Sequence, residues 1–492
     1  MSAPTTGQTP APVRARGPLT RRADTTLPDR LARSAAATRG TRFDTAGFHE
    51  WFAAQCAAGD YRVTRAPLAE LPGWSFQPGS GNLVHRSGRF FSVEGVHACS
   101  DTGPVREWHQ PIVRQPEVGI LGMLVKEFDG VLHFLMQAKM EPGNLNVLQL
   151  SPTVQATRSN FTKVHGGAAV EYLEYFAQEG RGRVLVDSLQ SEHGSWFLHK
   201  SNRNMVVEAF GEVEPREGFR WLTLGQIGEL LRRDNLVNMD SRTVLACLPM
   251  GRAGSRPGRP GVFAESFGRS WDPDCGAVHS DVDVKSWLTA ERSRRGLVTR
   301  SVPLAGLPGW TLGEYALSHD EGRYFDVVGV HVEAGSREVT RWSQPLIEPR
   351  GVGEVAFVVK RVHGVLHVLA QARTEAGFQD TVQVGPTVQC TGGNHAWLPP
   401  GDRPPFLDLV LGAAAGAVRY EAVHSEEGGR FLNAQARCRV VEAGEDFAVD
   451  EPPGFRWLTL SQMAMLTGHD NSVNVQARTL MACINLLAHS WG

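Results

Sequence analysis

The sequence predicts two tandem copies of one α+β domain, in which layers of strands and helices pack against each other. The first observation is a long internal repeat, because VREWHQPIVRQPEVGILGMLVKEFDGVLHFLMQAK from residue 105 matches VTRWSQPLIEPRGVGEVAFVVKRVHGVLHVLAQAR from residue 339. The match has no gaps, so that Pro111 pairs with Pro345 and Thr153 with Thr387 at one constant spacing. The second observation is that strand-like apolar runs and helix-start signals are interleaved within each copy. We therefore infer the duplication of a whole domain.

Composition places the chain among globular proteins and excludes several classes of partner. With 492 residues, 41% of them hydrophobic, and a net charge of −2, the chain can bury a core in each of two to four domains. No run of Lys and Arg predicts nucleic-acid binding, and no apolar run is long enough to cross a membrane. The seven cysteines are scattered without a CxxC pair, which predicts reduced thiols in a cytoplasmic protein.

The predicted boundaries follow from shifts in composition. Residues 1–40 are rich in Pro, Thr, Ala and Arg, which favours a disordered tail over the alternative of an organelle transit peptide. The first repeat is then expected over residues 41–248 and the second over residues 277–492. Between them, residues 249–276 are rich in Gly, Pro and Arg, as is typical of a linker.

Turn and cap residues predict the local elements in order. Asp129-Gly130 between two apolar runs predicts a hairpin, and His363-Gly364 takes its place in the second copy. In the strand after that turn, alternation predicts a core face made by Leu132, Phe134, Met136 and Ala138. An apolar stripe ending at a glycine predicts a helix over residues 168–180. Capping boxes predict further helices that begin near Leu224 and Leu460; their polar members are Thr223, Gln226, Thr459 and Gln462.

Familiar cofactor and metal motifs are absent from the sequence. It contains no GxxxxGK[ST] loop, no GxGxxG after a strand, no GxSxG elbow, no HExxH and no Cys/His cluster at metal-ligand spacing. We therefore expect neither a redox cofactor nor a metal ion.

Polar and aromatic residues gather after the hairpin of the first copy. Arg and Lys in such a loop suit a phosphorylated ligand, whereas the alternative for any single residue is a solvated loop. Trp108 and Gln110, repeated as Trp342 and Gln344, are candidates either to line a pocket or to anchor the hairpin. The other candidates are Gln155, Arg158, Asn160, Lys163, His165, Glu192, Trp196, Lys200, Asn202 and Arg203.

Comparison of the copies distinguishes residues that both copies share from residues that only the first copy has. Gln155, Glu192 and Arg203 have counterparts in the second copy, so they are expected to serve the common frame. After the shared PTVQxT, the first copy continues RSNFTKVHGG and the second continues GGNHAWLPPG. The chemistry is therefore predicted in the first copy, with a vestigial pocket in the second.

Several motifs resemble those of the NDP-hexose 2,3-dehydratases of deoxysugar biosynthesis: WHQP, LSPTVQATRSNF, VHGG, YLEYF, SWFLHKSNRNMVVE and GFRWLTLGQI. The resemblance covers roughly residues 45–490. It implies a Nudix-like fold in each half, a homodimer, and a dTDP-4-keto-6-deoxyhexose substrate. The implied reaction removes water across carbons 2 and 3 without a cofactor, and a downstream 3-ketoreductase uses the product.

Residue chemistry then suggests roles for the candidates. His165 is the first choice for acid or base, because its ordinary pKa lies closest to neutrality. Lys163 is a candidate to stabilise the enolate or protonate the leaving hydroxyl, with Glu192 as reserve base. Diphosphate binding is assigned to Arg158, Arg203 and Lys200, thymine stacking to Trp108 or Trp196, and sugar or base contacts to Asn160 and Asn202. The alternatives are a Nudix-like nucleotide-sugar hydrolase and a noncatalytic nucleotide-sugar binder.

Overall fold

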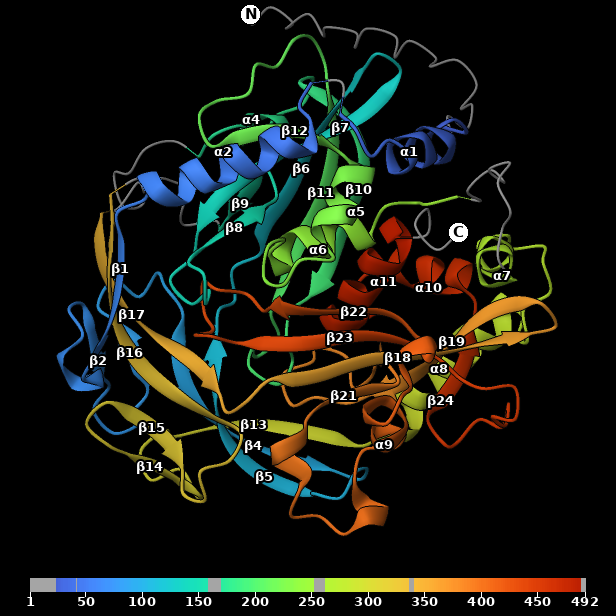
Figure 1. Cartoon of the computed structure of the whole chain (residues 1–492). Helices are drawn as coiled ribbons and strands as arrows, with labels where there is room; N and C mark the ends of the chain where they lie inside the picture. Colours follow the sequence, from blue (N-terminus) through green and yellow to red (C-terminus); the bar gives the residue numbers. More distant parts are fainter. Residues whose placement is uncertain (1–23, 41, 158–169, 252–261, 336–339, 488–492) are drawn as a thin grey trace, which may run out of the picture.

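The computed structural model describes residues 24–40, 42–157, 170–251, 262–335 and 340–487. Each half of the chain contains a seven-stranded sheet, and two five-stranded sheets complete the molecule. Figure 1 shows the seven-stranded sheet of the first half at the top and the one of the second half below it, on the right.

The two seven-stranded sheets have the same strand order. In the first half it is β10-β11-β6-β7-β12, with β8 paired to β7 and β9 paired to β6. In the second half it is β22-β23-β18-β19-β24, with β20 paired to β19 and β21 paired to β18. One pair in each sheet is parallel, β6 with β11 and β18 with β23. The bounds are β6 Gly119–Phe128, β7 Val131–Met140, β8 Leu148–Ser151, β9 Val154–Ala156, β10 Gly182–Ser191, β11 Ser201–Ala209, β12 Phe219–Thr223, β18 Gly353–Val362, β19 Val365–Arg373, β20 Gln383–Gly385, β21 Val388–Thr391, β22 Val418–Ser425, β23 Gln435–Glu442 and β24 Phe455–Leu458.

The five-stranded sheets exchange their first strands between the halves. β1 of the first half pairs with β16 of the second, and β13 of the second half pairs with β4 of the first. Each exchanged strand is antiparallel to its partner over six residues. The two halves are thereby tied together along their backbones. The strands are β1 Tyr61–Ala66, β2 Trp74–Phe76, β3 Leu83–His85, β4 Ser92–Ser100, β5 Glu107–Arg114, β13 Leu297–Val302, β14 Trp310–Leu312, β15 Ala316–His319, β16 Phe325–Ala334 and β17 Arg341–Pro349.

Two central helices, α6 (Met239–Ala246) and α11 (Val475–Leu487), also join the halves. Arg242 of α6 donates through Nη2 to the Ser425 carbonyl at 2.6 Å, and Arg478 of α11 donates likewise to Ser191. Both arginines are fully buried. Such reciprocal contacts are expected from a duplicated unit that pairs with itself. The other α-helices of the described residues are α1 Leu27–Ala36, α2 Thr45–Ala58, α4 Glu174–Ala177, α5 Leu224–Leu230, α7 Val262–Ser270, α8 Asp281–Arg294, α9 Leu407–Leu411 and α10 Leu460–Thr467.

The predicted hairpins and capping boxes are confirmed. Asp129 and His363 adopt left-handed φ angles of 50° and 49°, and each is followed by a glycine that also has positive φ. Both capping boxes form at the expected threonines, so α5 and α10 begin at Leu224 and Leu460. On the predicted core face of β7, Leu132, Phe134 and Met136 are buried and Ala138 is half-buried. His133 and Leu135 on the other face are buried as well. The strand lies between two packed layers, which alternation alone does not indicate.

The helix expected over residues 168–180 is largely wrong. Within its described part, only α4 from Glu174 to Ala177 is helical, and turns precede it. Phe176 is nevertheless buried, so the short helix α4 is enough to pack this part of the apolar stripe into the core. An apolar stripe of this length fits a single helical turn as well as a longer helix, so it does not determine the length of the helix.

The expectation of a disordered tail fails for residues 24–40, and the expected linker contains a helix. Leu27, Leu31 and Ala35 of α1 form a buried stripe at a spacing of four residues. In the second half α7 is its counterpart, because Ser34 and Ser270 each donate from their hydroxyl to a carbonyl of β7 or β19. A stripe of only three apolar residues is enough here because the sheet supplies the rest of the core.

Leu31→Ala is expected to lower the free energy of unfolding by about 2–5 kcal/mol, because Leu31 is fully buried and leaves a cavity. Chemical denaturation measures this change. Arg33→Ala on the exposed side of the same helix is the matched control, with an expected effect within about 0.5 kcal/mol. Equal effects of the two substitutions would mean that α1 does not belong to the core.

Among the described residues, no helix combines the length and apolar character needed to cross a membrane. All seven cysteines are free thiols.

Candidate active site

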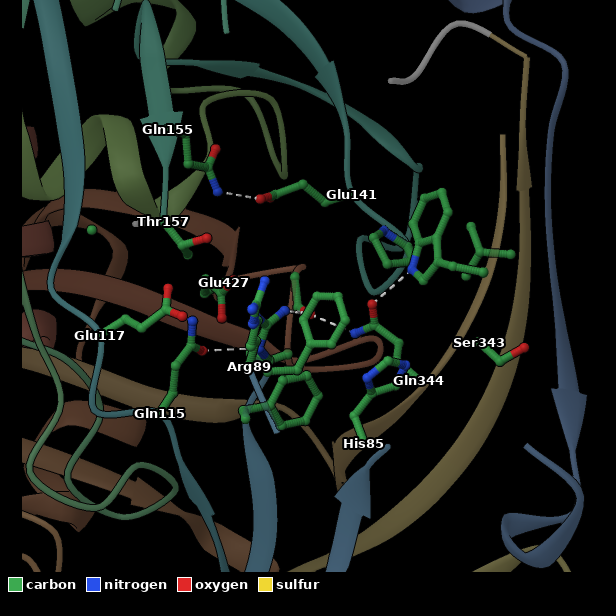
Figure 2. A pocket seen from close by; sticks show the side chains of 18 of the residues that line it. His85, Arg89, Gln115, Glu117, Glu141, Gln155, Thr157, Ser343, Gln344 and Glu427 are labelled. Atoms are coloured by element: carbon green, nitrogen blue, oxygen red, sulfur yellow. Dashed lines mark hydrogen bonds between the residues drawn. The ribbon is translucent and has the colours of Figure 1, made fainter. Parts of the chain in front are cut away.

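A cavity of about 1360 Å³ lies between the two halves and is lined by both. Glu141 and Gln155 of the first half and Gln344 and Glu427 of the second surround it in Figure 2. Its volume exceeds the roughly 300–1,000 Å³ of typical small-ligand sites, which leaves room for a ligand with several parts. The cavity has an acidic inner wall, formed by carboxylates including Glu141 and Glu427, and an outer wall rich in arginine and aromatic side chains.

Four carboxylates converge on the inner wall: Glu141, Glu192, Asp240 and Glu427. Glu141 and Glu192 directly follow the ends of β7 and β10, and Glu427 is the second residue after β22. Asp240 is in the first turn of α6. In the sheet order β10-β11-β6-β7, β7 and β10 run in the same direction, so that both strands end at the same edge of the sheet. The end of β22 from the second half packs near this edge, where Ser425 donates to Asn235. Their convergence is therefore a product of the duplicated architecture.

Hydrogen bonds hold these carboxylates but leave some oxygens unused. Asn202 Nδ2 donates to Glu192 Oε1 at 2.7 Å, and Gln155 Nε2 donates to Glu141 Oε1 at 2.5 Å. Glu192 Oε2, Asp240 Oδ1 and Glu427 Oε2 are buried without a hydrogen-bond partner among the described residues. Because unpaired buried oxygens are costly, these atoms are suited to receive a polar ligand.

Two of the carboxyl groups are shifted toward their protonated forms. Burial, reinforced by the negative charges of Glu141, Glu192 and Glu427, raises the pKa of Asp240 well above its ordinary value. Burial also raises the pKa of Glu427 to about 7, against the opposing attraction of Arg430. The raised pKa favours the protonated form of Asp240, which suits it to donate a proton, whereas Glu427, with a pKa of about 7, exchanges a proton readily in either direction at neutral pH.

Lys200 and Arg430 are among the cations that adjoin the acidic wall. Lys200 Nζ donates to Asn202 Oδ1 at 2.8 Å and to the Glu117 carbonyl, and burial lowers its pKa to about 8. Arg430 comes from the second half, donates through Nε to Gln115 Oε1 at 3.1 Å, and lies 4.2 Å from the centre of the Phe91 ring. These two groups place positive charge next to carboxyl groups that gain and lose protons.

The outer wall is rich in arginine and aromatic side chains. Phe90 is 39% exposed, and its ring meets His85 edge to face at 4.5 Å. Arginines and an exposed aromatic ring form a surface that suits a diphosphate joined to a planar base. The arginines of this wall are Arg62, Arg86, Arg89 and Arg341.

Four of the residues predicted from sequence line this cavity: Gln155, Glu192, Lys200 and Asn202. Four others lie outside the described residues: Arg158, Asn160, Lys163 and His165. The described residues that flank this stretch, Thr157 and Val170, both line the cavity. The expectation that His165→Ala or Lys163→Ala abolishes turnover with an unchanged unfolding curve remains a prediction, which steady-state assays and circular dichroism test.

The other four predicted residues do not line this cavity. Trp108 Nε1 donates to Gln110 Oε1, and Gln110 Nε2 donates to the Ser195 carbonyl at 2.7 Å, so the pair fixes β5 to the segment that follows β10. Trp196 stacks on His193 at a centroid distance of 5.0 Å. Arg203 makes a two-pronged ion pair with Asp187 on the exposed side of β10 and β11.

Sequence reasoning missed Asp240, Glu427 and Arg430. A signal for Glu427 and Arg430 was present, because SEHGSWFLHKSN from residue 191 aligns with SEEGGRFLNAQA from residue 425. Glu427 thereby corresponds to His193, and Arg430 corresponds to Trp196.

The positions equivalent to Asp240 and Glu427 carry Gln476 and His193, whereas those equivalent to Glu141 and Glu192 keep a carboxylate. His193 is fully enclosed and pairs through Nε2 with Glu426 at 2.9 Å. Burial opposes the charge of His193, but Glu426 overcomes it and the pKa of His193 is raised. Lys200 and Asn202 correspond to Ala434 and Ala436, which offer no polar group. The proton-exchanging set is thus specific to the cavity described above.

Comparisons with known proteins agree with the repeat. The family model described as NDP-hexose 2,3-dehydratase matches residues 45–248 and again residues 281–484. A protein of Amycolatopsis orientalis named dTDP-4-dehydro-6-deoxy-alpha-D-glucopyranose 2,3-dehydratase is 52% identical over 94% of both chains. Proteins with the same name from Saccharopolyspora spinosa and Streptomyces violaceoruber are 48% and 50% identical, over 93% and 90% of this chain and 95% and 98% of their own. The expected mixed α and β fold of two repeats is confirmed, and the chain belongs to the NDP-hexose 2,3-dehydratase family.

Proposed function

We propose that this chain is a hydro-lyase that removes water from dTDP-4-keto-6-deoxy-D-glucose to give dTDP-3,4-diketo-2,6-dideoxy-D-glucose. The observation that carries the proposal is the cavity wall of carboxyl groups with raised pKa values beside Lys200. The names of relatives about half identical to this chain over most of its length support the same substrate.

The reaction needs a base, an acid and a positive charge. The 4-keto group acidifies the hydrogen on carbon 3, so a base takes that proton and the electron pair moves to the carbon 4 oxygen as an enolate. The bond from carbon 2 to its oxygen then breaks, and an acid supplies the proton with which the hydroxyl leaves as water. The resulting enol tautomerises to the 3,4-diketone.

Each role has a candidate on the inner wall. Glu427 takes the proton from carbon 3, because a pKa of about 7 makes it half ionised at neutrality and a base of matched strength. Asp240 gives its proton to the leaving hydroxyl, because its raised pKa favours the protonated form. The ammonium of Lys200 stabilises the enolate oxygen. Glu192, predicted as the reserve base, offers its unused Oε2 to a sugar hydroxyl.

The outer wall accounts for the rest of the substrate. Arg62, Arg86, Arg89 and Arg341 supply charge for the diphosphate, and Phe90 offers an exposed ring for thymine. The sugar then extends inward to the carboxyl groups. Binding energy from the nucleotide end thus positions carbons 2 and 3 for elimination.

Incubation of the purified full chain with dTDP-4-keto-6-deoxyglucose tests the proposal. NMR of the product is expected to show loss of the 2-hydroxyl and a new methylene at carbon 2, without added nicotinamide. Release of dTMP and a sugar phosphate would instead indicate the nucleotide-sugar hydrolase. Tight binding with an unchanged sugar would indicate the noncatalytic binder, and both results would overturn the proposal.

The turnover number is expected to fall as pH rises above about 8, because Lys200 loses its proton there and the enolate loses its counter-charge. In Lys200→Arg the guanidinium stays charged, so this alkaline fall should shift to higher pH even where the maximal rate is reduced. A pH profile of the turnover number measures both. An alkaline limb that is identical in the wild type and Lys200→Arg would assign it to another group.

We further propose a cytoplasmic homodimer whose halves are Nudix-like, as the family resemblance implied. The product, a vicinal diketone, is a substrate for a separate 3-ketoreductase. Analytical ultracentrifugation measures the oligomeric state, and a monomer at micromolar concentration would contradict the dimer.

A further inference from the structure

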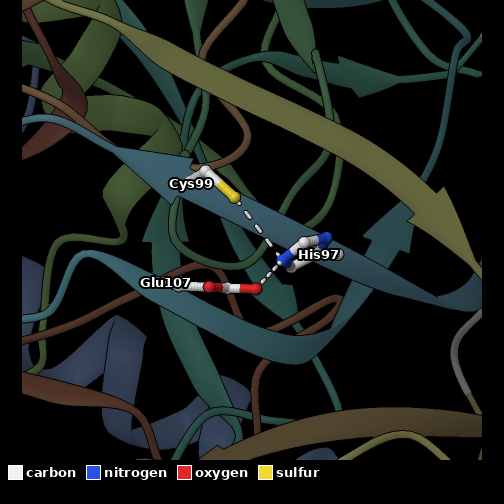
Figure 3. A group of neighbouring side chains, drawn as sticks. All are labelled: His97, Cys99 and Glu107. Atoms are coloured by element: carbon white, nitrogen blue, oxygen red, sulfur yellow. Dashed lines mark hydrogen bonds and ion pairs between the residues drawn. The ribbon is translucent and has the colours of Figure 1, made fainter.

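Three potential metal ligands meet on the five-stranded sheet of the first half. Cys99 Sγ lies 3.5 Å from His97 Nε2, and Glu107 Oε1 lies 2.8 Å from the same nitrogen. All three ligand atoms fall within 4.8 Å of one another. Figure 3 shows the three side chains turned toward one another above the sheet. None of them lines the cavity of the candidate active site.

The strand register explains why the three side chains meet. His97 and Cys99 are alternate residues of β4 and project from one face of the sheet. β5 runs antiparallel to β4 and places Glu107 directly opposite Cys99 and His109 directly opposite His97. Cross-strand neighbours of this kind have Cβ atoms about 5 Å apart. The backbone therefore holds the three ligands together.

The same face of the equivalent sheet in the second half meets the substrate cavity. There His331, Glu333 and Arg341 take the places of His97, Cys99 and Glu107, and all three line the cavity. The fold thus uses this face as a ligand-facing wall, and both halves carry an imidazole there. The first half adds a thiol and a carboxylate where the second half has a carboxylate and a guanidinium.

We propose that His97, Cys99 and Glu107 form a Zn²⁺ site, with water as the fourth ligand. A thiolate and an imidazole favour Zn²⁺ over Mg²⁺ or Ca²⁺, which prefer oxygen ligands. Bonds of about 2.0–2.3 Å in a tetrahedral site place ligand atoms about 3.5 Å apart, as Cys99 and His97 already are. Glu107 is 65% exposed and needs only a small outward shift. The proposal does not depend on the dehydratase activity.

Binding replaces the proton of the Cys99 thiol, and this proton passes to the solvent. Affinity for Zn²⁺ should consequently rise with pH. The other ionisable groups on this face are His109, whose ring stacks on His97 at 4.4 Å with an interplanar angle of 8°, and Arg300, opposite His97 on β13. The stack on His109 orients the His97 ring, and Arg300 lowers the affinity by repulsion.

Titration of the dialysed, tag-free full chain with Co²⁺ and Zn²⁺ tests the site. One equivalent of Co²⁺ is expected to give a thiolate charge-transfer band in the near ultraviolet, which Zn²⁺ then displaces. Cys99→Ser and His97→Ala should lose the band and at least tenfold in Zn²⁺ affinity. Cys56→Ser, which removes another exposed thiol, is the matched control and should keep both.

Wild-type protein without the band, or a band that survives in Cys99→Ser, would overturn the proposal. Dehydration rates and unfolding curves of Cys99→Ser should stay close to those of the wild type, because the side chain is exposed. This readout separates loss of the ion from loss of the fold.

Discussion

Asp240→Asn is expected to lower the turnover number for dehydration by about 100- to 10,000-fold, the range that a positioned general acid contributes. The amide has nearly the shape of the carboxyl group but cannot release a proton to the leaving hydroxyl. Steady-state kinetics with dTDP-4-keto-6-deoxyglucose measure the loss. Asp408→Asn, on the exposed surface of α9, is the matched control and should change the rate less than twofold. A mild effect at Asp240 would assign the acid role to another residue.

The same substitution should not weaken the fold at neutral pH. The pKa of Asp240 is raised in the folded protein, so the folded state binds more protons than the unfolded state between the two pKa values. Stability therefore falls as pH rises through that window, and the asparagine removes this cost. The melting temperature at pH 7 is expected to equal or exceed that of the wild type. A large drop would indicate a structural role for the carboxyl group.

Glu427→Gln is expected to lower the turnover number by a similar factor, although residue 427 belongs to the second repeat. If Glu427 is the base, the wild-type rate should rise with pH through about 7 as the carboxyl ionises. This acid limb should disappear in the glutamine variant. A pH profile that keeps the limb would mean that the group titrating near pH 7 is not Glu427.

His193→Gln provides the matched control for Glu427, because the two residues occupy equivalent positions in the two halves. His193 pairs with Glu426 away from the cavity, so its loss should affect stability more than turnover. Equal losses of turnover in both variants would mean that the interface between the halves, not the acidic wall, limits the reaction.

Much of the fold follows from local sequence rules. Asp129-Gly130 and the two capping boxes carry their structure in two to four residues, so they were predictable. The exchange of β1 and β13 was not, because pairing with another half leaves no mark on a strand's own pattern. α1 was missed for a related reason, since its three apolar residues gain their core from a sheet far away in sequence.

The candidate site was half predictable for the same physical reason. Lys200 and Asn202 belong to a motif that sequence inspection selects, and both line the cavity. Glu427 and Arg430 reach the cavity from the other repeat, so in the sequence only their difference from His193 and Trp196 indicates a role in the site. The sequence predicts Arg203 as a phosphate ligand, but in the fold Arg203 pairs with Asp187 on the neighbouring strand, a contact that the sequence does not indicate.

The most direct test is a crystal structure of the full chain with dTDP-glucose, which lacks the 4-keto group and cannot undergo the elimination. The sugar is expected in the cavity between the repeats, with carbons 2 and 3 against Asp240 and Glu427 and the diphosphate beside the arginines of the outer wall. A sugar bound instead against Glu375 and Gln389 of the second repeat would contradict a single active site built by both halves.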